Sequence, residues 1–168
     1  PSQNLIVKPR FGCGSKGVRI TQGGGNDLGD DDIFQEVCSG PEVTVDAFND
    51  PVRGFTWTVC RERLETKSGV STKCRLFRDT KLNELAVTLA KVAGFAGSFC
   101  FQVMRCNGEW AIIDVNPRPG AATSMCLATG NDFFSATFAL AFGENYERYF
   151  NEFTDECYVT RQYADFRS

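Results

Sequence analysis

The stretch "FCFQVMRCNGEWAIIDVNPRPGAA", residues 99–122, contains two short apolar runs separated by Asn107-Gly108. Asn-Gly is the dipeptide most typical of a two-residue turn between antiparallel strands. The flanking residues 99–105 and 109–115 are rich in aromatic and β-branched side chains, which favour strands. The stretch therefore predicts a β-hairpin, and this hairpin decides how the rest of the chain is interpreted.

The second predicted strand ends in polar residues. Asp114, Asn116 and Arg118 stand at every second position, so strand geometry predicts that they share one face. Pro117 and Pro119 then end the strand. An acid, an amide and a guanidinium at one strand end are either a ligand-binding edge or ordinary turn-forming residues.

Composition limits the classes of protein to consider. The chain has 168 residues, of which 42% are hydrophobic and 23% charged, and this predicts a single folded domain. A net charge of −3 argues against general nucleic-acid binding. Apolar runs stay shorter than the roughly 18 residues of a membrane span. We expect a cytoplasmic protein with neither nucleic acid nor membrane as a partner.

The chain has eight cysteines and no histidine. The cysteines form no C-x-x-C pair, so zinc-binding spacing is lacking, and we expect buried, reduced thiols. Without histidine, the Ser-His-Asp and Cys-His nucleophile systems are excluded.

The remaining chain reads as short strands and a few helices. Alternating patterns predict further strands at 5–7, 18–20, 33–37, 42–48, 55–64, 70–77 and 158–166. Helical spacing predicts helices from Asp79 or Thr80 to Gly94, at 122–129 and at 132–142, the last with Asn131 as its cap and an aromatic stripe of Phe134, Phe138 and Phe142. The predicted class is α+β with mostly antiparallel strands and no internal domain boundary.

Two segments outside the hairpin contain candidate binding residues. "KPRFGCGSKGV", residues 8–18, is a glycine-rich loop after a strand, which either presents backbone amides to phosphate or is an ordinary hairpin turn. The segment "IFQEVCSGPEVTVD", residues 33–46, contains Glu36 and Glu42. Either Glu36 accepts from an adenine amino group and Glu42 from ribose hydroxyls, or both glutamates face solvent.

The hairpin itself offers oxygen ligands. Asp114 supplies a carboxylate, and the amide oxygens of Gln102 and Asn116 could complete the coordination of a hard cation such as Mg²⁺. Arg118 could hold phosphoryl or carboxylate oxygens with its planar guanidinium.

In this order the three segments resemble the ATP-grasp superfamily, and within it the carbamoyl-phosphate-synthase-like branch. The likeness rests on "IVKPRFGCGSKGV", "FQEVCSGPEVTVD", "FCFQV" and "IIDVNPRPGAA" and spans residues 5 to about 130. It implies an ATP-grasp fold of antiparallel sheets flanked by helices. It further implies that residues 1–168 are the C-terminal part of such a domain, which lacks its N-terminal portion.

The resemblance assigns nucleotide-binding roles position by position. Lys8 would contact ATP phosphate and take part in catalysis, and Gly14 and Ser15 would lie in a loop that closes over the phosphates. Glu36 and the backbone of Val37 would hold adenine.

The same resemblance assigns the remaining roles. Glu42 would hold the ribose. Gln102, Asp114 and Asn116 would ligate Mg²⁺, with Mn²⁺ as an alternative ion and with one or two ions left open. Arg118 would act in catalysis by stabilising the transferred phosphoryl group. Arg61, Arg63 and Lys73 lie near the expected phosphate end, but we interpret each as a solvated strand charge.

The implied activity is that of an ATP- and Mg-dependent ligase component. It would activate a small-molecule carboxylate as an acyl phosphate for attack by an amine or similar nucleophile. A phosphotransferase on the same scaffold and a non-catalytic nucleotide-binding or assembly module are the alternatives. The expected partners are ATP, the carboxylate, and a missing N-terminal domain or partner chain; a homo-oligomer stays open.

Overall fold

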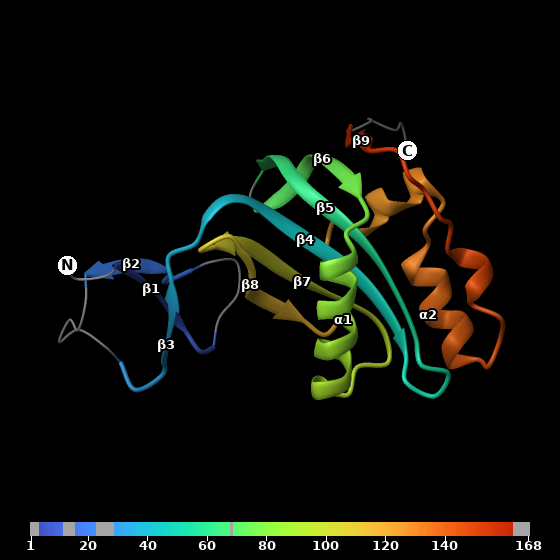
Figure 1. Cartoon of the computed structure of the whole chain (residues 1–168), viewed down its shortest axis with the longest axis horizontal. Coiled ribbons are helices and arrows are strands. Elements are labelled where there is room, and N and C mark those ends of the chain that lie inside the picture. Colours follow the sequence, from blue (N-terminus) through green and yellow to red (C-terminus); the bar gives the residue numbers. More distant parts are fainter. Residues whose placement is uncertain (1–3, 12–15, 23–28, 68, 163–168) are drawn as a thin grey trace, which may run out of the picture.

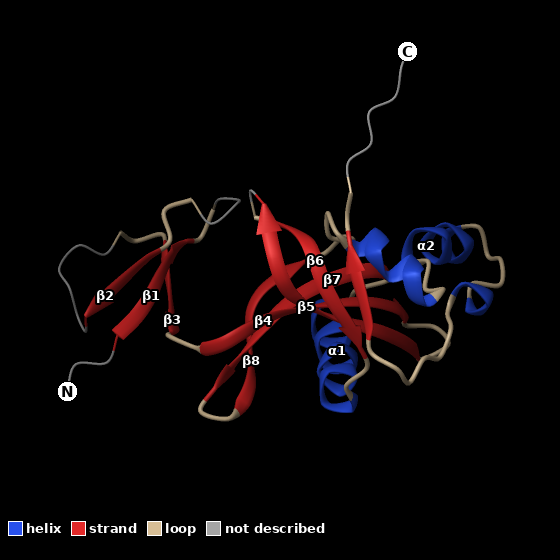
Figure 2. Ribbon diagram, turned by 90° about the horizontal axis from the view of Figure 1, so that it is seen from above, coloured by secondary structure: helices blue, strands red, loops and turns tan. Residues whose placement is uncertain are grey.

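The structure is a computed structural model that describes residues 4–11, 16–22, 29–67 and 69–162. Its strands form two antiparallel sheets (Figures 1 and 2). The small sheet has the order β2-β1-β3, with β1 Asn4–Pro9, β2 Arg19–Gln22 and β3 Asp32–Glu36. The large sheet has the order β8-β7-β4-β5-β6-β9, with β4 Ser39–Asp50, β5 Phe55–Lys67, β6 Val70–Phe77, β7 Gly97–Cys106, β8 Glu109–Asn116 and β9 Cys157–Thr160. The α+β class with antiparallel sheets is confirmed.

Helix α1, Thr80–Ala93, covers one face of the large sheet (Figure 1). It begins where the Asp79 side chain accepts from the amide of Leu82 at 3.0 Å, and it ends at Gly94, whose φ of 69° suits a left-handed cap. Its apolar stripe packs on inward-facing residues of β4 and β7 such as Val45 and Phe101. Both predicted helix limits are confirmed.

The opposite face of the large sheet is covered only in part. The 3₁₀-helix η1 (Thr123–Thr129), helix α2 (Phe133–Ala141) and the 3₁₀ turn η2 (Glu147–Tyr149) gather at one end of the sheet. There they enclose a second apolar core. Its fully buried members include Phe48, Val59, Leu76, Cys126 and Phe133. The rest of this face carries polar side chains.

The C-terminal predictions need correction. The helix predicted at 122–129 is present as a 3₁₀-helix over Thr123–Thr129. Asp132, and not Asn131, caps α2, because its carboxylate accepts from the amides of Phe134 and Ser135. Asn131 is instead buried, and its side-chain oxygen accepts from the indole of Trp57 at 2.8 Å.

Two further details refine the sequence-based expectation. The aromatic stripe of α2 points outward, because Phe133 and Ala136 face the core while Phe138 and Phe142 are 66% and 78% exposed. Strand β9 is limited to Cys157–Thr160, and the end of the predicted strand lies outside the described residues.

The seven cysteines among the described residues are free thiols, as expected, and Cys13 lies outside the described residues. Cys60, Cys74, Cys100 and Cys126 are buried and unpaired. Within the described part of the chain, we find no helix that is both long enough and apolar enough to cross a membrane.

Candidate functional site

The register of the β7–β8 hairpin brings the predicted ligands together. Gln102 pairs directly with Asp114, and Cys100 pairs with Asn116. Asp114 and Asn116 therefore point to the same face as Gln102. Arg118 lies just beyond the end of β8, so the expectation that all three polar residues belong to one strand holds for two of them.

Two adjoining clefts open beside this hairpin. The inner cleft has a volume of about 540 Å³ and is lined by β4, β5, β6, β7, β8 and the loop after β8. The outer cleft, of about 520 Å³, lies between the small sheet and the β7–β8 hairpin. The two clefts share five of their lining residues, namely Glu42, Gln102, Asp114, Asn116 and Arg118. Five of the predicted site residues thus form the boundary between two halves of one larger hollow.

A polar row runs across the large sheet at this boundary. Asp114 faces Gln102, Gln102 faces Thr44, and Thr44 faces Arg61. Directly opposed residues of neighbouring strands point to the same face of a sheet. Successive residues of a strand point to opposite faces of the sheet. The polar row therefore lies on one face, whereas its strand neighbours Val43, Val45 and Val103 point to the other face and pack under α1.

The oxygen donors of the hairpin suit a hard cation. A carboxylate and amide oxygens are ligands that Mg²⁺ accepts, and Mg²⁺ in proteins usually completes its shell with substrate phosphates and water. The Asn116 amide donates to the Asp114 carboxylate at 2.8 Å, which holds the two side chains side by side. Among the described residues, no group of three or more acidic or thiol side chains is arranged around a metal site. One carboxylate with two amide oxygens is a donor set that would fit an ion shared with a phosphate ligand.

Lys8 reaches the same region from the small sheet. Its ammonium group donates to the carbonyl oxygen of Ile113 at 2.6 Å, next to Asp114 in sequence. Arg118 also donates to a backbone carbonyl, that of Pro119 at 3.0 Å. Both cations line the outer cleft, where their charges can meet an anion.

Glu42 and Arg63 form an ion pair at the edge of the inner cleft. Arg63 also donates to the carbonyl oxygen of Gly69. The Glu42 carboxylate, which the resemblance assigns to ribose, is therefore already oriented by a guanidinium. Arg63 has a structural partner and is not simply a solvated strand charge.

The residues predicted to hold adenine lie at the end of β3. Glu36 lines the outer cleft and accepts from the Cys106 thiol at 3.2 Å. This hydrogen bond to Glu36 is the main cause that raises the pKa of the Cys106 thiol to about 12. Val37 follows directly in sequence, is 40% exposed, and does not line either cleft with its side chain. Gly14 and Ser15 lie outside the described residues.

The structure contradicts the interpretation of Arg61 as a solvated strand charge. Arg61 is only 3% exposed, and its guanidinium donates to the buried carboxylate of Asp46 at 3.0 and 3.4 Å and to the Ser71 hydroxyl at 3.3 Å. Burial acts to lower the pKa of Arg61, but the Asp46 charge and hydrogen bonds outweigh it and raise the pKa. Lys73, by contrast, is exposed as expected.

Sequence reasoning missed the Asp46–Arg61 pair. The available signal was a pair of opposite charges in two neighbouring, otherwise apolar strand patterns, "EVTVDAF" and "TVCRER". A buried charge is costly unless it is paired, so charges at strand positions that should be buried predict each other as partners. Recognising this requires the strand register, which the sequence leaves open.

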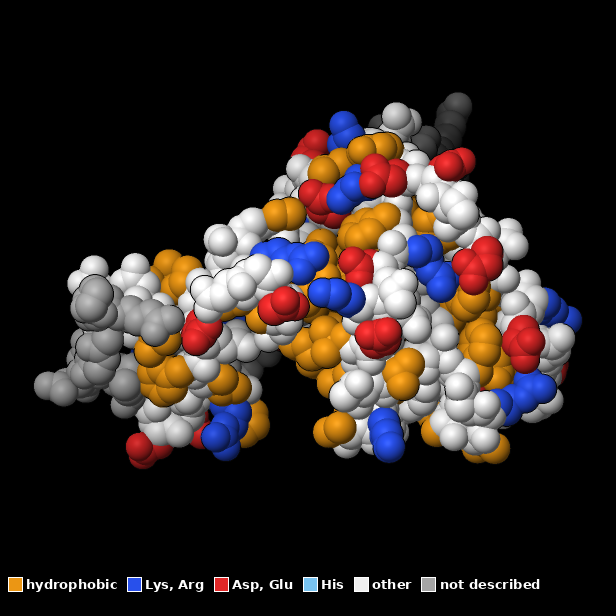
Figure 3. Space-filling view, in the orientation of Figure 1, with side chains coloured by type: hydrophobic (Ala, Val, Ile, Leu, Met, Phe, Trp, Pro, Cys, Tyr) orange, Lys and Arg blue, Asp and Glu red, His pale blue; other side chains and the backbone are white. Residues whose placement is uncertain are grey.

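The surface electrostatics agree with the composition. On the face shown in Figure 3, acidic and basic side chains are interspersed among the described residues and form no continuous basic surface.

Inside the inner cleft, burial raises the pKa of the Cys100 thiol to about 12, so this cysteine stays protonated near neutral pH.

Comparison with solved structures finds the same fold in larger proteins. N5-carboxyaminoimidazole synthetase from Staphylococcus aureus, complexed with ADP, matches with a TM-score of 0.65 at 18% identity, over 85% of this chain and 42% of that chain. A biotin carboxylase complex with β-γ-ATP from Campylobacter jejuni matches with a TM-score of 0.66 at 21% identity, over 84% and 37%.

A third match is the biotin carboxylase domain of 2-oxoglutarate carboxylase from Hydrogenobacter thermophilus, in complex with MgADP, ADP and bicarbonate. Its TM-score is 0.63 at 18% identity, over 83% of this chain and 36% of that chain. The chain thus spans less than half the length of these solved proteins. At these identities the matches show the fold alone.

The family assignment rests on sequence. A search among curated proteins found no match. The sequence model described as "ATP-grasp domain" matches residues 1–122, which include the glycine loop, the β3–β4 segment and the whole β7–β8 hairpin. The chain therefore belongs to the ATP-grasp family.

Proposed function

We propose that this chain is the ATP-binding part of an ATP- and Mg-dependent ligase that activates a carboxylate as an acyl phosphate. An amine or a similar nucleophile would then displace phosphate. The observation that carries the proposal is the convergence of Glu42, Gln102, Asp114, Asn116 and Arg118 on the boundary of two clefts, with Lys8 reaching the outer cleft from the small sheet.

The charges of the hollow suit phosphoryl transfer. Such transfer depends mostly on positioning and on neutralising charge, so the lack of a histidine base is no obstacle. Carboxylates already pair with Arg61 and Arg63, whereas Lys8 and Arg118 donate to backbone carbonyls. An incoming phosphate can replace those carbonyls as acceptor, and charge-assisted hydrogen bonds to phosphate are the stronger ones.

In this proposal each residue has a distinct task. Glu36 and the Val37 backbone bind the adenine edge, and Glu42 orients the ribose. Lys8 binds a nucleotide phosphate, and Arg118 stabilises the group in transfer. Gln102, Asp114 and Asn116 would hold Mg²⁺, which when bound neutralises the phosphate charge.

The finer assignments also belong to this proposal. We place the chain in the carbamoyl-phosphate-synthase-like branch because of the four ordered sequence blocks that begin at Ile6 and end at Ala122. We further propose that residues 1–168 act as one part of a larger ATP-grasp domain. In support, the solved proteins of this fold are more than twice as long as the matched region.

The test is a turnover assay of the full-length protein with ATP, Mg²⁺ and panels of small carboxylates and amines. The proposal predicts release of ADP and inorganic phosphate that depends on both a carboxylate and an amine. A phosphorylated product without phosphate release would assign a phosphotransferase instead. Nucleotide binding without any turnover across the panels would assign a non-catalytic module.

A further inference from the structure

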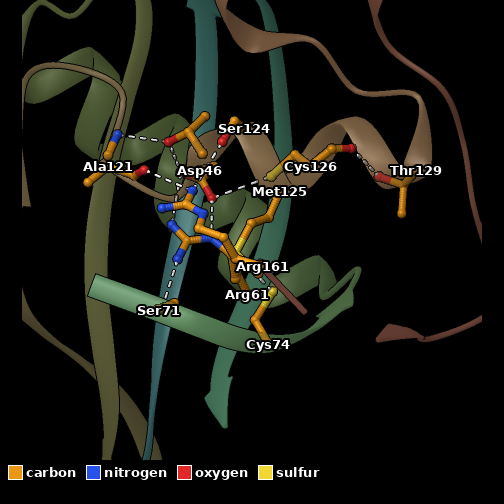
Figure 4. Close-up of polar contacts among 12 residues, drawn as sticks. Asp46, Arg61, Ser71, Cys74, Ala121, Ser124, Met125, Cys126, Thr129 and Arg161 are labelled. Carbon is orange, nitrogen blue, oxygen red and sulfur yellow. Dashed lines mark hydrogen bonds and ion pairs between the residues drawn. The ribbon is translucent and has the colours of Figure 1, made fainter. Parts of the chain in front are cut away.

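A buried carboxylate lies beneath the loop that carries Arg118. Asp46 is fully buried in the centre of the large sheet. Its carboxylate accepts four hydrogen bonds, two from the Arg61 guanidinium, one from the Thr123 hydroxyl at 2.5 Å and one from the Cys126 thiol at 3.5 Å. Figure 4 shows Arg61 from β5 and Cys126 from η1 pointing toward Asp46.

Thr123 connects this carboxylate to the loop after β8. Its hydroxyl oxygen, which donates to Asp46, also accepts from the backbone amide of Gly120 at 2.8 Å. Gly120 is two residues after Arg118, and Arg118 in turn donates to the Pro119 carbonyl between them. A continuous hydrogen-bonded path therefore runs from the sheet centre to the segment that presents Arg118.

The loop also fits closely over the ion pair. A Cβ atom at Gly120 would lie 3.3 Å from the Cys100 sulfur, 3.4 Å from the Thr123 hydroxyl and 3.7 Å from a guanidinium nitrogen of Arg61. On its outer side, Arg161 donates to the Ala121 carbonyl at 3.2 Å. The loop is thus fixed from both sides, and the path through Thr123 is its link to the sheet centre.

We propose that Asp46 and Thr123 are positioning residues for Arg118. The Asp46 carboxylate, held by Arg61, orients the Thr123 hydroxyl, and this hydroxyl holds the Gly120 amide so that the Arg118 guanidinium meets the reacting group. The predicted effect on turnover rests on the proposed function. The predicted hydrogen-bonded anchoring of the loop does not depend on any reaction.

The first test is a double-mutant cycle in the full-length protein. Thr123→Val keeps the shape of the side chain but removes its donor and acceptor. With Arg118 present, we expect kcat to fall by about tenfold to a hundredfold with KM for ATP nearly unchanged, because small displacements of a positioned group have costs of this order. In an Arg118→Ala background, the same substitution should change kcat by less than about twofold, because sites that act through one another are not additive.

Two variants separate positioning from general stability. Thr123→Ser retains the hydroxyl and should restore kcat. Thr137→Val is the matched control, because the Thr137 hydroxyl also links two elements, here α2 and β7. It accepts from the Ser98 amide at 3.0 Å and donates to the Phe133 carbonyl at 2.8 Å. This variant should lower thermal stability to a similar extent without the kcat effect. Equal losses of kcat from Thr123→Val with and without Arg118 would overturn the proposal.

Hydrogen exchange tests the same inference without turnover. Thr123→Val should speed amide exchange in residues 118–124 and leave α2 unchanged, whereas Thr137→Val should do the reverse. If the wild-type protein turns over nothing, the proposed function fails, while faster exchange in the loop still supports Thr123 as its anchor. Unchanged exchange at the Gly120 amide in Thr123→Val would overturn the positioning role, whatever the activity.

Discussion

Asp114 is the carboxylate of the predicted ligand set, and its neighbours Gln102 and Asn116 are neutral amides. One negative charge attracts a divalent cation weakly by itself, and Mg²⁺ in proteins commonly relies on substrate phosphates for further ligands. At the scale of single residues, the site is therefore expected to bind Mg²⁺ and nucleotide together.

Asp114→Asn should weaken Mg-dependent nucleotide binding by about tenfold or more. Even the loss of a residue that only hydrogen-bonds to a metal ligand commonly lowers metal affinity by about tenfold to a hundredfold. Calorimetric titration with and without Mg²⁺ measures this change. Asp155→Asn is the matched control, because Asp155 is exposed and lines neither cleft. An unchanged Mg²⁺ dependence in Asp114→Asn would remove Asp114 from the ligand set.

Glu36→Ala should reduce the preference for ATP over GTP by about tenfold, because a carboxylate accepts a hydrogen bond from the amino group of adenine but repels the carbonyl oxygen that guanine has at that position. Competition binding with the two nucleotides gives the ratio. Glu109→Ala serves as the comparison, because the Glu109 side chain is 80% exposed at the far end of β8. Selectivity that survives the loss of Glu36 would place adenine elsewhere.

Arg118→Ala should lower kcat by about a hundredfold while the Kd for ATP changes little, because a group that acts on the transferred phosphoryl stabilises mainly the transition state. Steady-state kinetics and equilibrium binding together supply both numbers. Arg148→Ala, an exposed arginine on η2, is the control. A variant that loses ATP affinity but keeps kcat would make Arg118 a ground-state binding residue.

At the scale of elements, local sequence signals predict some features well and others poorly. The Asn107-Gly108 turn, the Asp79 cap and the Gly94 cap depend on nearest neighbours, and the structure has each where it was predicted. The 3₁₀-helix 123–129 begins at Thr123, whose hydroxyl donates to Asp46, a residue 77 positions away. Contacts of that range lie beyond what local patterns can indicate.

The α1 cap gives a stability prediction. Asp79→Ala should cost about 1 kcal/mol of unfolding free energy, because the Leu82 amide loses its acceptor. Asp79→Asn keeps an acceptor oxygen and should retain most of that stability. Denaturant unfolding compares the two variants, and equal losses in both would mean that the charge, rather than the cap, is what matters.

The turn after β4 gives a pH prediction. Burial acts to raise the pKa of Asp50, but hydrogen bonds from Tyr146 and from the amides of Arg53 and Val52 outweigh it and lower the pKa. A lowered folded-state pKa stabilises the protein above the ordinary carboxyl pKa and ceases to do so as the pH falls through the folded value. Tyr146→Phe removes the hydroxyl that donates to Asp50 at 2.7 Å.

Near pH 7, Tyr146→Phe should cost roughly 1.5 to 3 kcal/mol, the usual contribution of a hydrogen bond to a charged group. The difference from wild type should be constant down to about pH 5 and shrink below about pH 4. Urea unfolding along a pH series measures it. A difference that grows in acid would show that Tyr146 does not act through ionised Asp50.

At the scale of the whole molecule, the sequence predicts the site better than it predicts the support beneath it. Gln102, Asp114 and Asn116 could be grouped because they belong to one hairpin with a recognisable turn. Asp46 and Arg61 could not, since their pairing needs the register of β4 against β5 and the covering loop from residues 117–122. The meeting of the two sheets, which brings Lys8 to Ile113, is likewise a tertiary feature.

The central claim is that these residues form an ATP site for carboxylate activation. The most direct measurement is positional isotope exchange in the full-length protein, with ATP labelled with ¹⁸O at the β–γ bridge, Mg²⁺ and a candidate carboxylate, but no amine. Reversible formation of an acyl phosphate predicts scrambling of the bridge label only when the carboxylate is present, and loss of scrambling in Arg118→Ala. For a carboxylate that supports turnover once an amine is added, an ATP pool that keeps its label in the bridge would contradict the account.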